Sequence, residues 1–324
     1  MDAIKNFKPV TWIVGGALVF LAIYPLIGAK SYMKHLFILF FIWAVVAAYW
    51  NLLMGYVGIN SLGNIGFLAI GGYTSGILAK TFGLSPFLTI PIGGVAASLL
   101  VTVFLGFPAL RLSGIYIALL TLIFADTLPS LLTQSRGITG GGMGLHEIPG
   151  FFPGMDKTGA YYVCMAFFLV AMYVIYRIIH SNTGLAFVAL RDSENFASTL
   201  GVSRFRERLK VFAISSFMTG LAGGFYVHSL GDISPTTLAI EPFLLALAMI
   251  ELGGVGTFFG PILGAGAIVF GNEFLRLAGT LRLTLLGALI CIVILFYPGG
   301  LMQLITQLGS LYRKLIQKQR SSHS

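Results

Sequence analysis

The sequence predicts an all-α fold, a polytopic bundle of about ten transmembrane helices, some of which can be broken or re-entrant where glycine is abundant. Two properties of the composition predict it. Of the 324 residues, 57% are hydrophobic and 10% are charged, and the mean hydropathy is +0.91. Soluble domains carry about 25% charged residues. Most of this protein's surface therefore does not face water, which excludes a soluble domain.

The third observation is the length of the apolar runs. A helix of about 20 apolar residues covers the hydrocarbon core of a bilayer. Ten runs fit this length: Thr11–Gly28, Leu36–Tyr56, Leu62–Ala79, Pro86–Phe107, Ser113–Leu132, Gly159–Ile179, Val211–Leu230, Glu241–Gly256, Phe258–Leu275 and Leu283–Tyr297. The third, eighth and ninth are short, glycine-rich or continuous with a neighbour. We expect any broken or re-entrant helix among these three, covered by protein or a water-filled path.

Charge between the runs predicts the orientation. With the N-terminus inside, thirteen basic residues lie on the cytoplasmic side and seven outside, in agreement with the positive-inside rule. Both termini are then cytoplasmic. We expect residues 1–300 to form the transmembrane domain, with Thr11–Gly28 as a retained first span and not a cleaved signal. We expect residues 301–324 to form a basic cytoplasmic tail with the pattern of an interfacial amphipathic helix. The net charge of +9 follows from this loop pattern and does not indicate nucleic-acid binding.

The inner loop 180–210 is the most strongly charged internal stretch. Asp192, Ser193 and Glu194 are typical of a helix start, and the short helix they open is expected to end at Gly201. The basic residues that follow can pair with acidic groups of a partner protein or with anionic lipid. Taken by itself, the loop is better explained as a solvated linker that sets topology by its charge.

Glycine is unusually frequent, with 41 residues, and two glycine runs at 63–76 and 253–266 have loosely similar spacing. Small residues allow membrane helices to approach closely, and internal repeats are common in transporters. The runs therefore indicate either diverged copies of one structural unit or tight helix packing.

Five motifs in order resemble those of the permeases of branched-chain amino acid ABC importers, over residues 45–300. The first is GYVGINSLGNIGFLAIGGYT at 55–74, similar to the pattern GYxGxxSLGxxxFxxIGAYT of that family. The others are SGIYIALLTL at 113–122, TGGGMGL at 139–145, the segment 191–201, and GGVGTFFGPILG at 253–264. Within the family the chain is most similar to the LivM-like type of subunit. It departs at Gly142 and Met143, where Ser-Asp or Ser-Asn is common, and at Ser198, where alanine is frequent.

The resemblance implies a type II-like importer permease that moves branched-chain or other hydrophobic amino acids by alternating access. It implies separate ATPase subunits that bind ATP, a related second permease subunit in a heterodimer, an extracytoplasmic solute-binding protein and a bacterial inner membrane. It also implies that the inner loop couples to the ATPase. The candidate coupling residues are Arg191, Glu194, Phe196, Ala197, Leu200, Gly201 and Arg204, with the apolar ones expected on one helix face.

Polar and ionisable groups inside spans are candidates for the translocation pathway, since they are costly in lipid and usually face a bundle interior or a cavity. A zwitterionic substrate needs partners for its charges, and a broken helix offers backbone dipoles. The candidates are Asn60, Ser61, Asn64, Tyr73, Thr74, Tyr116, Asp126 and Glu251. Pairing with a neighbouring helix is the alternative role for each.

Catalytic and metal-binding patterns are absent from the sequence. The glycines at 140–144 lack the Gly-Lys-Ser/Thr end of a phosphate-binding loop, the five histidines are scattered, and Cys164 and Cys291 lie in apolar runs. We therefore expect no enzyme, no metal and no cofactor in this chain. The alternatives are a permease for urea or short amides within the same family, an ATPase-independent secondary transporter, which would need several deep acidic residues, and an intramembrane enzyme.

Overall fold

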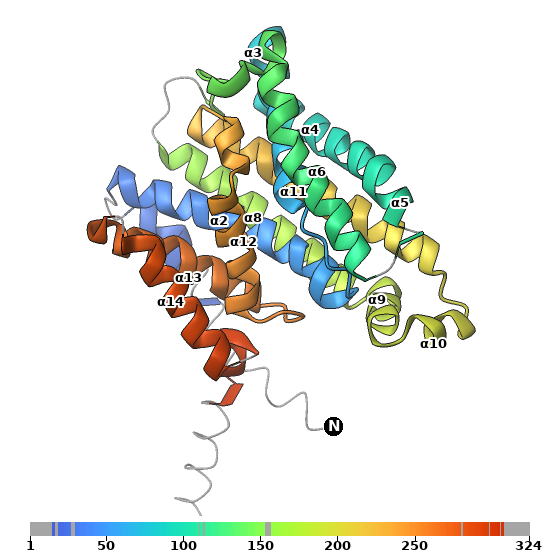
Figure 1. Cartoon of the computed structure of the whole chain (residues 1–324). Helices are drawn as coiled ribbons and strands as arrows, with labels where there is room; N and C mark the ends of the chain where they lie inside the picture. The colour runs from blue at the N-terminus through green and yellow to red at the C-terminus, as the bar shows by residue number, and fades with distance from the viewer. Residues whose placement is uncertain are drawn as a thin grey trace, which may run out of the picture.

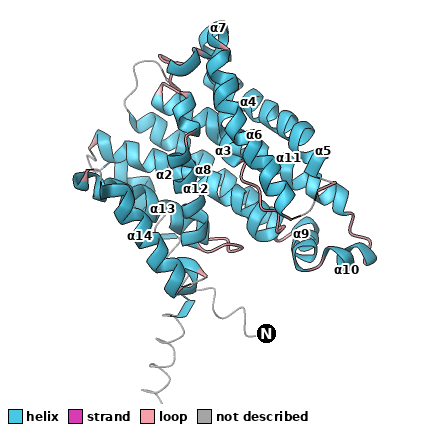
Figure 2. Ribbon diagram, viewed as in Figure 1, coloured by secondary structure: helices cyan, strands magenta, loops and turns pink. Residues whose placement is uncertain are grey.

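The described part of the chain is almost entirely helical. The structure, a computed structural model, describes residues 15–16, 19–26, 30–109, 111–112, 114–152, 157–279, 281–297, 299–304 and 306–307. Figure 2 shows helices joined by short loops, and within the described residues the only β-type pairing is one isolated bridge between Leu145 and Ile233. The all-α prediction is confirmed. The tail 301–324 lies largely outside the described residues, and the predicted first run Thr11–Gly28 is described only at residues 15–16 and 19–26.

The long helices are α2 (Ser31–Asn51), α3 (Asn64–Phe82), α4 (Pro86–Val101), α6 (Ile115–Gln134), α8 (Lys157–Ile179) and α11 (Arg204–Leu230). The shorter ones are α5 (Phe107–Ala109), α7 (Arg136–Thr139), α9 (Asn182–Asp192), α10 (Glu194–Thr199), α12 (Ile240–Gly253), α13 (Gly260–Phe274) and α14 (Leu281–Phe296). Two π-helical turns, η3 (Leu52–Tyr56) and η4 (Thr102–Gly106), extend α2 and α4, and 3₁₀ turns form η2 (Tyr24–Leu26), η5 (Gly141–Met143), η6 (Pro235–Leu238) and η7 (Leu275–Ala278).

Five helical stretches in the described part of the chain are long and apolar enough to cross a membrane: Ser31–Tyr56, Pro86–Ala109, Ile115–Gln134, Lys157–Ile179 and Arg204–Leu230. The prediction of about ten spans is therefore not confirmed. At 1.5 Å per residue, α12 and α13 are about 21 and 22 Å long, less than a hydrocarbon core of about 30 Å. These two pack together as a hairpin, which fits the expectation that the eighth and ninth runs depart from simple upright spans.

The third predicted run, for which a broken helix was one possibility, forms a continuous helix in the structure. Residues 64–82 form one unbroken helix, and the irregular backbone lies before it, between η3 and α3. The sequence could not separate these cases because glycines at 63, 66, 71 and 72 reduce helix propensity along the whole run. In the folded chain, packing against α11 and α4 supports α3 throughout.

Helix α2 forms the centre of the bundle, with α8, α11, α12 and α13 packed around it (Figure 1). In its most apolar window 78% of the residues are buried, against 11% for α6. Phe41, Tyr49 and Trp50 are fully buried. The core therefore follows α2, and α6 lies at the edge of the molecule.

Glycines allow α3, α4 and α11 to form a second tightly packed group. A Cβ at Gly71 would collide with the backbone of Gly220, and one at Gly223 would collide with the carbonyl of Leu68. Such close backbone approach is a common way for helices to associate in lipid. Of the two interpretations of the first glycine run, the structure therefore supports tight packing.

Loop α9–α10 lies at one end of the bundle, which we call the α9–α10 end. Helices α2, α4 and α8 finish there and α3, α6 and α11 begin there, while α7 lies at the opposite end (Figures 1 and 2). Serines cap the loop's helices locally, since Ser193 accepts from the N–H of Phe196 and Ser203 from that of Arg206, both at 3.4 Å.

Candidate functional site

The charged inner loop folds as two helices and not as the single helix predicted from about Arg191 to Gly201. Arg191 and Asp192 are the last residues of α9, and Ser193 adopts an extended backbone conformation that separates α9 from α10. Gly201, at φ +83°, follows the second helix. Helix α9 was missed because its own residues carry little helix signal, and it is held instead by burial of Phe187 and Leu190 against the bundle.

The apolar residues Phe196 and Ala197 of α10 and Leu200, which follows it, do not share one face. Ala197 is buried at 1% exposure, whereas Phe196 and Leu200 are 66% and 67% exposed. The prediction that all three lie together is therefore wrong. The loop presents two large apolar side chains outward, and the small one lets α10 lie close to α9, with which it packs.

Glu194 attaches α10 to the start of α11. One carboxylate oxygen accepts a hydrogen bond from Arg204 at 2.6 Å, and the other pairs with Arg208. Burial of the carboxylate raises its pKa, but the hydrogen bond from Arg204 and the charge and hydrogen bond of Arg208 outweigh this, so the pKa of Glu194 lies below its ordinary value. Glu194 is therefore ionised at neutral pH.

Arg208 is the buried member of this cluster, with its side chain 5% exposed. Besides Glu194, its guanidinium donates to the carbonyls of Ala109 and Leu112 at 3.2 and 3.1 Å. It thus joins α10, α11 and the segment after α5 at one point. Sequence reasoning placed Arg208 among the charges after the coupling helix and did not identify this role, because the carbonyls it binds are about 100 positions away in the chain.

Arg191 connects the loop to the core helix α2. Its guanidinium donates to the carbonyl of Gly55 at 2.9 Å. In the turn before this point, Asn51 donates to the carbonyl of Thr257 at 2.9 Å and accepts from the N–H of Gly256 at 2.8 Å. The loop, the end of α2 and the second glycine run therefore meet in one hydrogen-bonded cluster.

A cavity of about 250 Å³ opens between the loop and the bundle. Asn60 lines it together with Glu194 and Arg208. One predicted pathway residue and one predicted coupling residue thus share a polar cavity at the α9–α10 end.

Ser61 and Asn64 lie deeper, fully buried. Asn64 donates to Ser215 of α11 at 3.5 Å, and the side-chain oxygens of Ser61 and Asn64 have no hydrogen-bond partner in the described part of the chain. Tyr73 is also buried with an unpartnered hydroxyl, and Thr74 is half-buried. These four residues belong to the α3 region.

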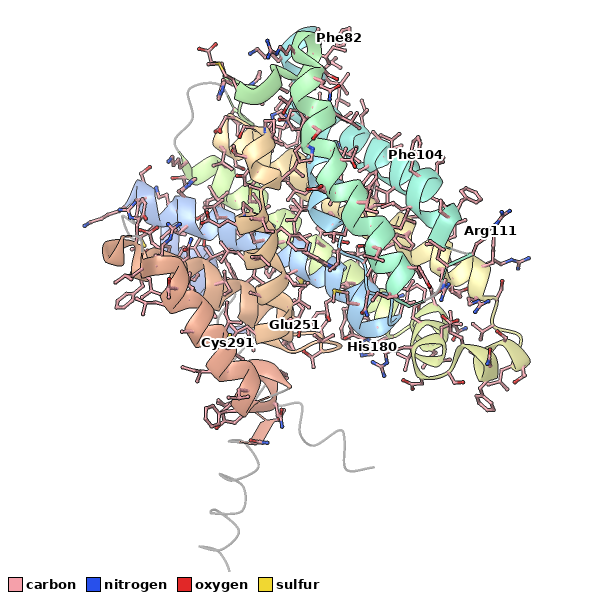
Figure 3. All side chains as sticks on the ribbon, in the orientation of Figure 1. Phe82, Phe104, Arg111, His180, Glu251 and Cys291 are labelled. Carbon is pink, nitrogen blue, oxygen red and sulfur yellow. The ribbon has the colours of Figure 1, made fainter. Side chains whose placement is uncertain are left out.

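The remaining pathway candidates lie elsewhere. Tyr116 is 62% exposed and Asp126 lies ten residues further along the same peripheral helix, α6. Glu251 is half-buried near the end of α12, and Figure 3 places it well away from α6. The structure therefore does not bring the eight candidates into one site.

Sequence reasoning also missed a buried polar cluster around His228 of α11. Its Nδ1 lies 2.6 Å from the carbonyl of Pro149, and its Nε2 lies 2.9 Å from the hydroxyl of Ser75 and 3.2 Å from that of Thr89. The neutral tautomer with Nδ1–H satisfies all three contacts. The one feature of the sequence that indicates this cluster is a histidine within an apolar run.

Metal ligands do not gather in the described residues, where no three His, Cys, Asp or Glu side chains lie close enough to hold an ion. Cys164 is buried, with its sulfur 3.3 Å from the Ser229 hydroxyl, and Cys291 is exposed.

Fold and site together define a multi-pass helical membrane protein with a folded polar loop at one end of its bundle. Comparison with known proteins gives the family: residues 32–296 match the branched-chain amino acid transport system permease component. The chain belongs to this family, as the five motifs predicted.

Curated relatives agree. The chain is 32% identical over 279 residues to the high-affinity branched-chain amino acid transport system permease protein LivM of Escherichia coli (strain K12), and 31% identical to that of Salmonella typhimurium (strain LT2). Each alignment covers 78% of this chain and 65% of the relative. A probable LivM of Methanocaldococcus jannaschii is 23% identical, with 69% and 76% covered. No solved structure matches.

Proposed function

We propose that this chain is the membrane-spanning permease subunit of an ATP-driven importer of branched-chain or other hydrophobic amino acids, working by alternating access. The observation that carries the proposal is the attachment of loop α9–α10. It presents Phe196 and Leu200 to a partner. Arg191 connects it to the end of α2, and Glu194 pairs with Arg208 of α11, which also binds the carbonyls of Ala109 and Leu112. A displacement of this loop would therefore be transmitted to several spans at once.

The partners follow from this function and from the family. ATP is bound by separate ATPase subunits that dock on loop α9–α10, a related permease subunit completes a heterodimer, and an extracytoplasmic binding protein delivers the solute. The chain itself acts as a transport subunit and not as an enzyme. Its place is the bacterial inner membrane, with the α9–α10 end and both termini in the cytoplasm.

Uptake by the complete complex in proteoliposomes tests this proposal. Radiolabelled leucine, isoleucine or valine should accumulate only with ATP on the ATPase side and with the binding protein on the other side. Accumulation by this chain alone, driven by an ion gradient, would contradict it and favour a secondary transporter. ATP-dependent uptake of urea or short amides instead would retain the mechanism and change the substrate.

Docking of the ATPase depends on the exposed face of α10. Leu200→Asp should weaken ATPase binding by about 30-fold, the loss of one central interface residue, because it places a charge in an apolar contact. Leu200 is 67% exposed, so folding should be preserved. Co-purification and titration in nanodiscs measure the binding.

Met143→Asp is the matched control for this docking experiment, since Met143 is 80% exposed in η5 near α7, at the other end of the bundle. It should leave ATPase binding unchanged. Equal affinities of the Leu200 and Met143 variants would show that α10 is not the docking element.

The exposed face of α6 provides the second part of the proposal. Asp126 is the twelfth residue of this 20-residue helix, near the middle of the span. A charge at the bilayer centre costs about 3 kcal/mol on insertion scales. By contrast, the exposed face of α4 and its extension η4 carries apolar residues such as Leu88, Leu99 and Phe104. We therefore assign α4 to lipid and the Tyr116–Asp126 face of α6 to the partner permease and the solute path.

Asp126→Asn should slow uptake at least about tenfold, the equivalent of roughly 1.4 kcal/mol, because the carboxylate offers a transient partner to the ammonium group of an amino acid. The amount of folded complex should not change. Asp232→Asn, the same substitution at an exposed position just after α11, is the control. Uptake that is equal in both variants would limit Asp126 to a packing role.

A further inference from the structure

A groove on the outer surface of the α9–α10 end belongs to no part of the proposed transport machinery. It consists of two adjoining hollows of about 710 and 320 Å³ that share Phe205 of α11. The first is lined mainly by the apolar end of α4 and α5, including Val103, Phe107 and Pro108. The second runs along α11 past Leu209 and Ala213.

Hydrocarbon would cover the approach to this groove. Along α4, the exposed side chains Leu88, Ile92, Val95, Leu99 and Val103 are all apolar, and they recur every three or four residues, which places them on one face of the helix. This stripe ends at Phe107, whose ring lies 6.5 Å from that of Phe205. Figure 3 shows Phe104 and Arg111 along the same edge of the molecule. The groove is therefore the end of a lipid-facing surface.

Basic side chains line this groove. Arg111 lines the first hollow, and Arg206 and Lys210 line the second. Lys210 pairs with Glu207 at 2.7 Å, whereas Arg111 and Arg206 have no ion pair with any described residue. Two guanidinium groups thus remain available where an apolar helix face reaches the membrane surface.

We propose that this groove is a binding site for one anionic phospholipid. The phosphate of the headgroup is bound by Arg111 and Arg206, since guanidinium groups bind phosphate oxygens in pairs, and an acyl chain lies over Val103, Phe107 and Phe205. Basic sites between membrane helices at the cytoplasmic surface select anionic headgroups. The combination of an apolar approach and unpaired arginines fits a lipid better than a protein surface or a free phosphate.

Such a lipid would contact both sides of the joint that holds the coupling loop. Phe205 and Arg206 lie in the first turn of α11, just before Arg208. In the sequence, Arg111 lies between Ala109 and Leu112, whose carbonyls Arg208 binds. The bound lipid would therefore stabilise the junction of α5, α10 and α11. This inference does not depend on which solute the protein transports.

Native mass spectrometry of the purified chain, titrated with phosphatidylglycerol or phosphatidylcholine, tests the site. The wild-type chain should retain one phosphatidylglycerol more tightly than phosphatidylcholine. Arg111→Gln/Arg206→Gln should weaken retention of phosphatidylglycerol by about 30-fold, the combined contribution typical of two basic side chains at an anionic surface. Binding of phosphatidylcholine should not change.

Arg136→Gln/Arg177→Gln is the matched control, since it removes the same charge at two exposed positions outside the groove. It should retain phosphatidylglycerol as the wild type does. Equal weakening by both double variants would overturn the proposal in favour of non-specific attraction. Protection of a Phe205→Cys probe by the ATPase or by a second permease subunit, and not by phosphatidylglycerol, would also overturn it. So would stabilisation by inorganic phosphate equal to that by the lipid.

Discussion

Gly223→Leu is expected to prevent the chain from folding stably. The Cβ of any residue at this position would collide with the carbonyl of Leu68 in α3. The atom it meets belongs to a helix backbone and cannot rotate away, so α3 and α11 would have to separate along their seam. Overpacking of a tight core costs about 3 kcal/mol or more, and here it also removes the contacts of the neighbouring pair Gly71 and Gly220.

Size-exclusion profiles and melting temperatures in detergent would measure this effect. Gly287→Leu is the control, because Gly287 also lies in an apolar helix but a Cβ added there would meet no atom within 4 Å. The Gly223 variant should aggregate or melt far below the wild type, and the Gly287 variant should behave like the wild type. Equal melting temperatures of the two variants would show that α3 and α11 are not tightly packed at Gly223.

Arg208→Met is expected to detach loop α9–α10 while the bundle stays folded. The substitution preserves bulk but removes the donor to one carboxylate oxygen of Glu194 and to the carbonyls of Ala109 and Leu112, while Arg204 still binds the other oxygen of Glu194. Removing one partner of a buried ion pair costs roughly 3–5 kcal/mol, and the partial exposure of Glu194 places this site at the lower end. In the proposed importer, ATP-driven uptake should fall below detection because movement of the docked ATPase would no longer be transmitted to α11.

Hydrogen exchange of residues 182–199 measures this detachment directly. Exchange should rise in Arg208→Met and stay at the wild-type rate in the control Arg177→Met, which changes an exposed arginine at the same end of the bundle. Glu194→Gln/Arg208→Met should recover part of the protection, since it removes the charge of a carboxylate that has lost one of its two arginine partners. Wild-type protection in Arg208→Met would show that the loop is held by other contacts.

Low pH should weaken the ion pair between Glu194 and Arg208. The pKa of Glu194 in the folded chain lies below its ordinary value, so the ion pair stabilises the loop fully above the unfolded value of about 4.3. This contribution is lost as the pH falls through the lower folded-state value. Protection of the loop should therefore be constant near neutral pH.

Sequence reasoning located the charged inner loop as a folded element but did not predict its internal geometry. The start signals at Asp192, Ser193 and Glu194 were real, and Ser193 does cap α10. The preceding helix, α9, could not be predicted from the sequence, because it is stabilised by a tertiary contact, the burial of Phe187 in the bundle. For the same reason the outward direction of Phe196 and Leu200 and the inward direction of Ala197 could not be predicted from spacing alone.

The pathway candidates show the same limit. An acid within an apolar run is costly wherever it lies, so Asp126 and Glu251 stand out in the sequence as unusual. Which of them faces a path depends on the neighbours of α6 and α12, and these neighbours are far away in the chain. Likewise, the bonding of His228 to Ser75, Thr89 and Pro149 joins three distant segments.

The sequence by itself determined that this is an all-helical membrane protein of the branched-chain amino acid permease family, because the low charge, the long apolar runs and the ordered motifs are local properties of the chain. The tertiary structure alone decided that glycines join α3 to α11, that α6 lies at the edge of the bundle, and that Arg208 holds the loop to the bundle. The physical reason is that each of these depends on atoms from distant segments, brought together only when the helices pack.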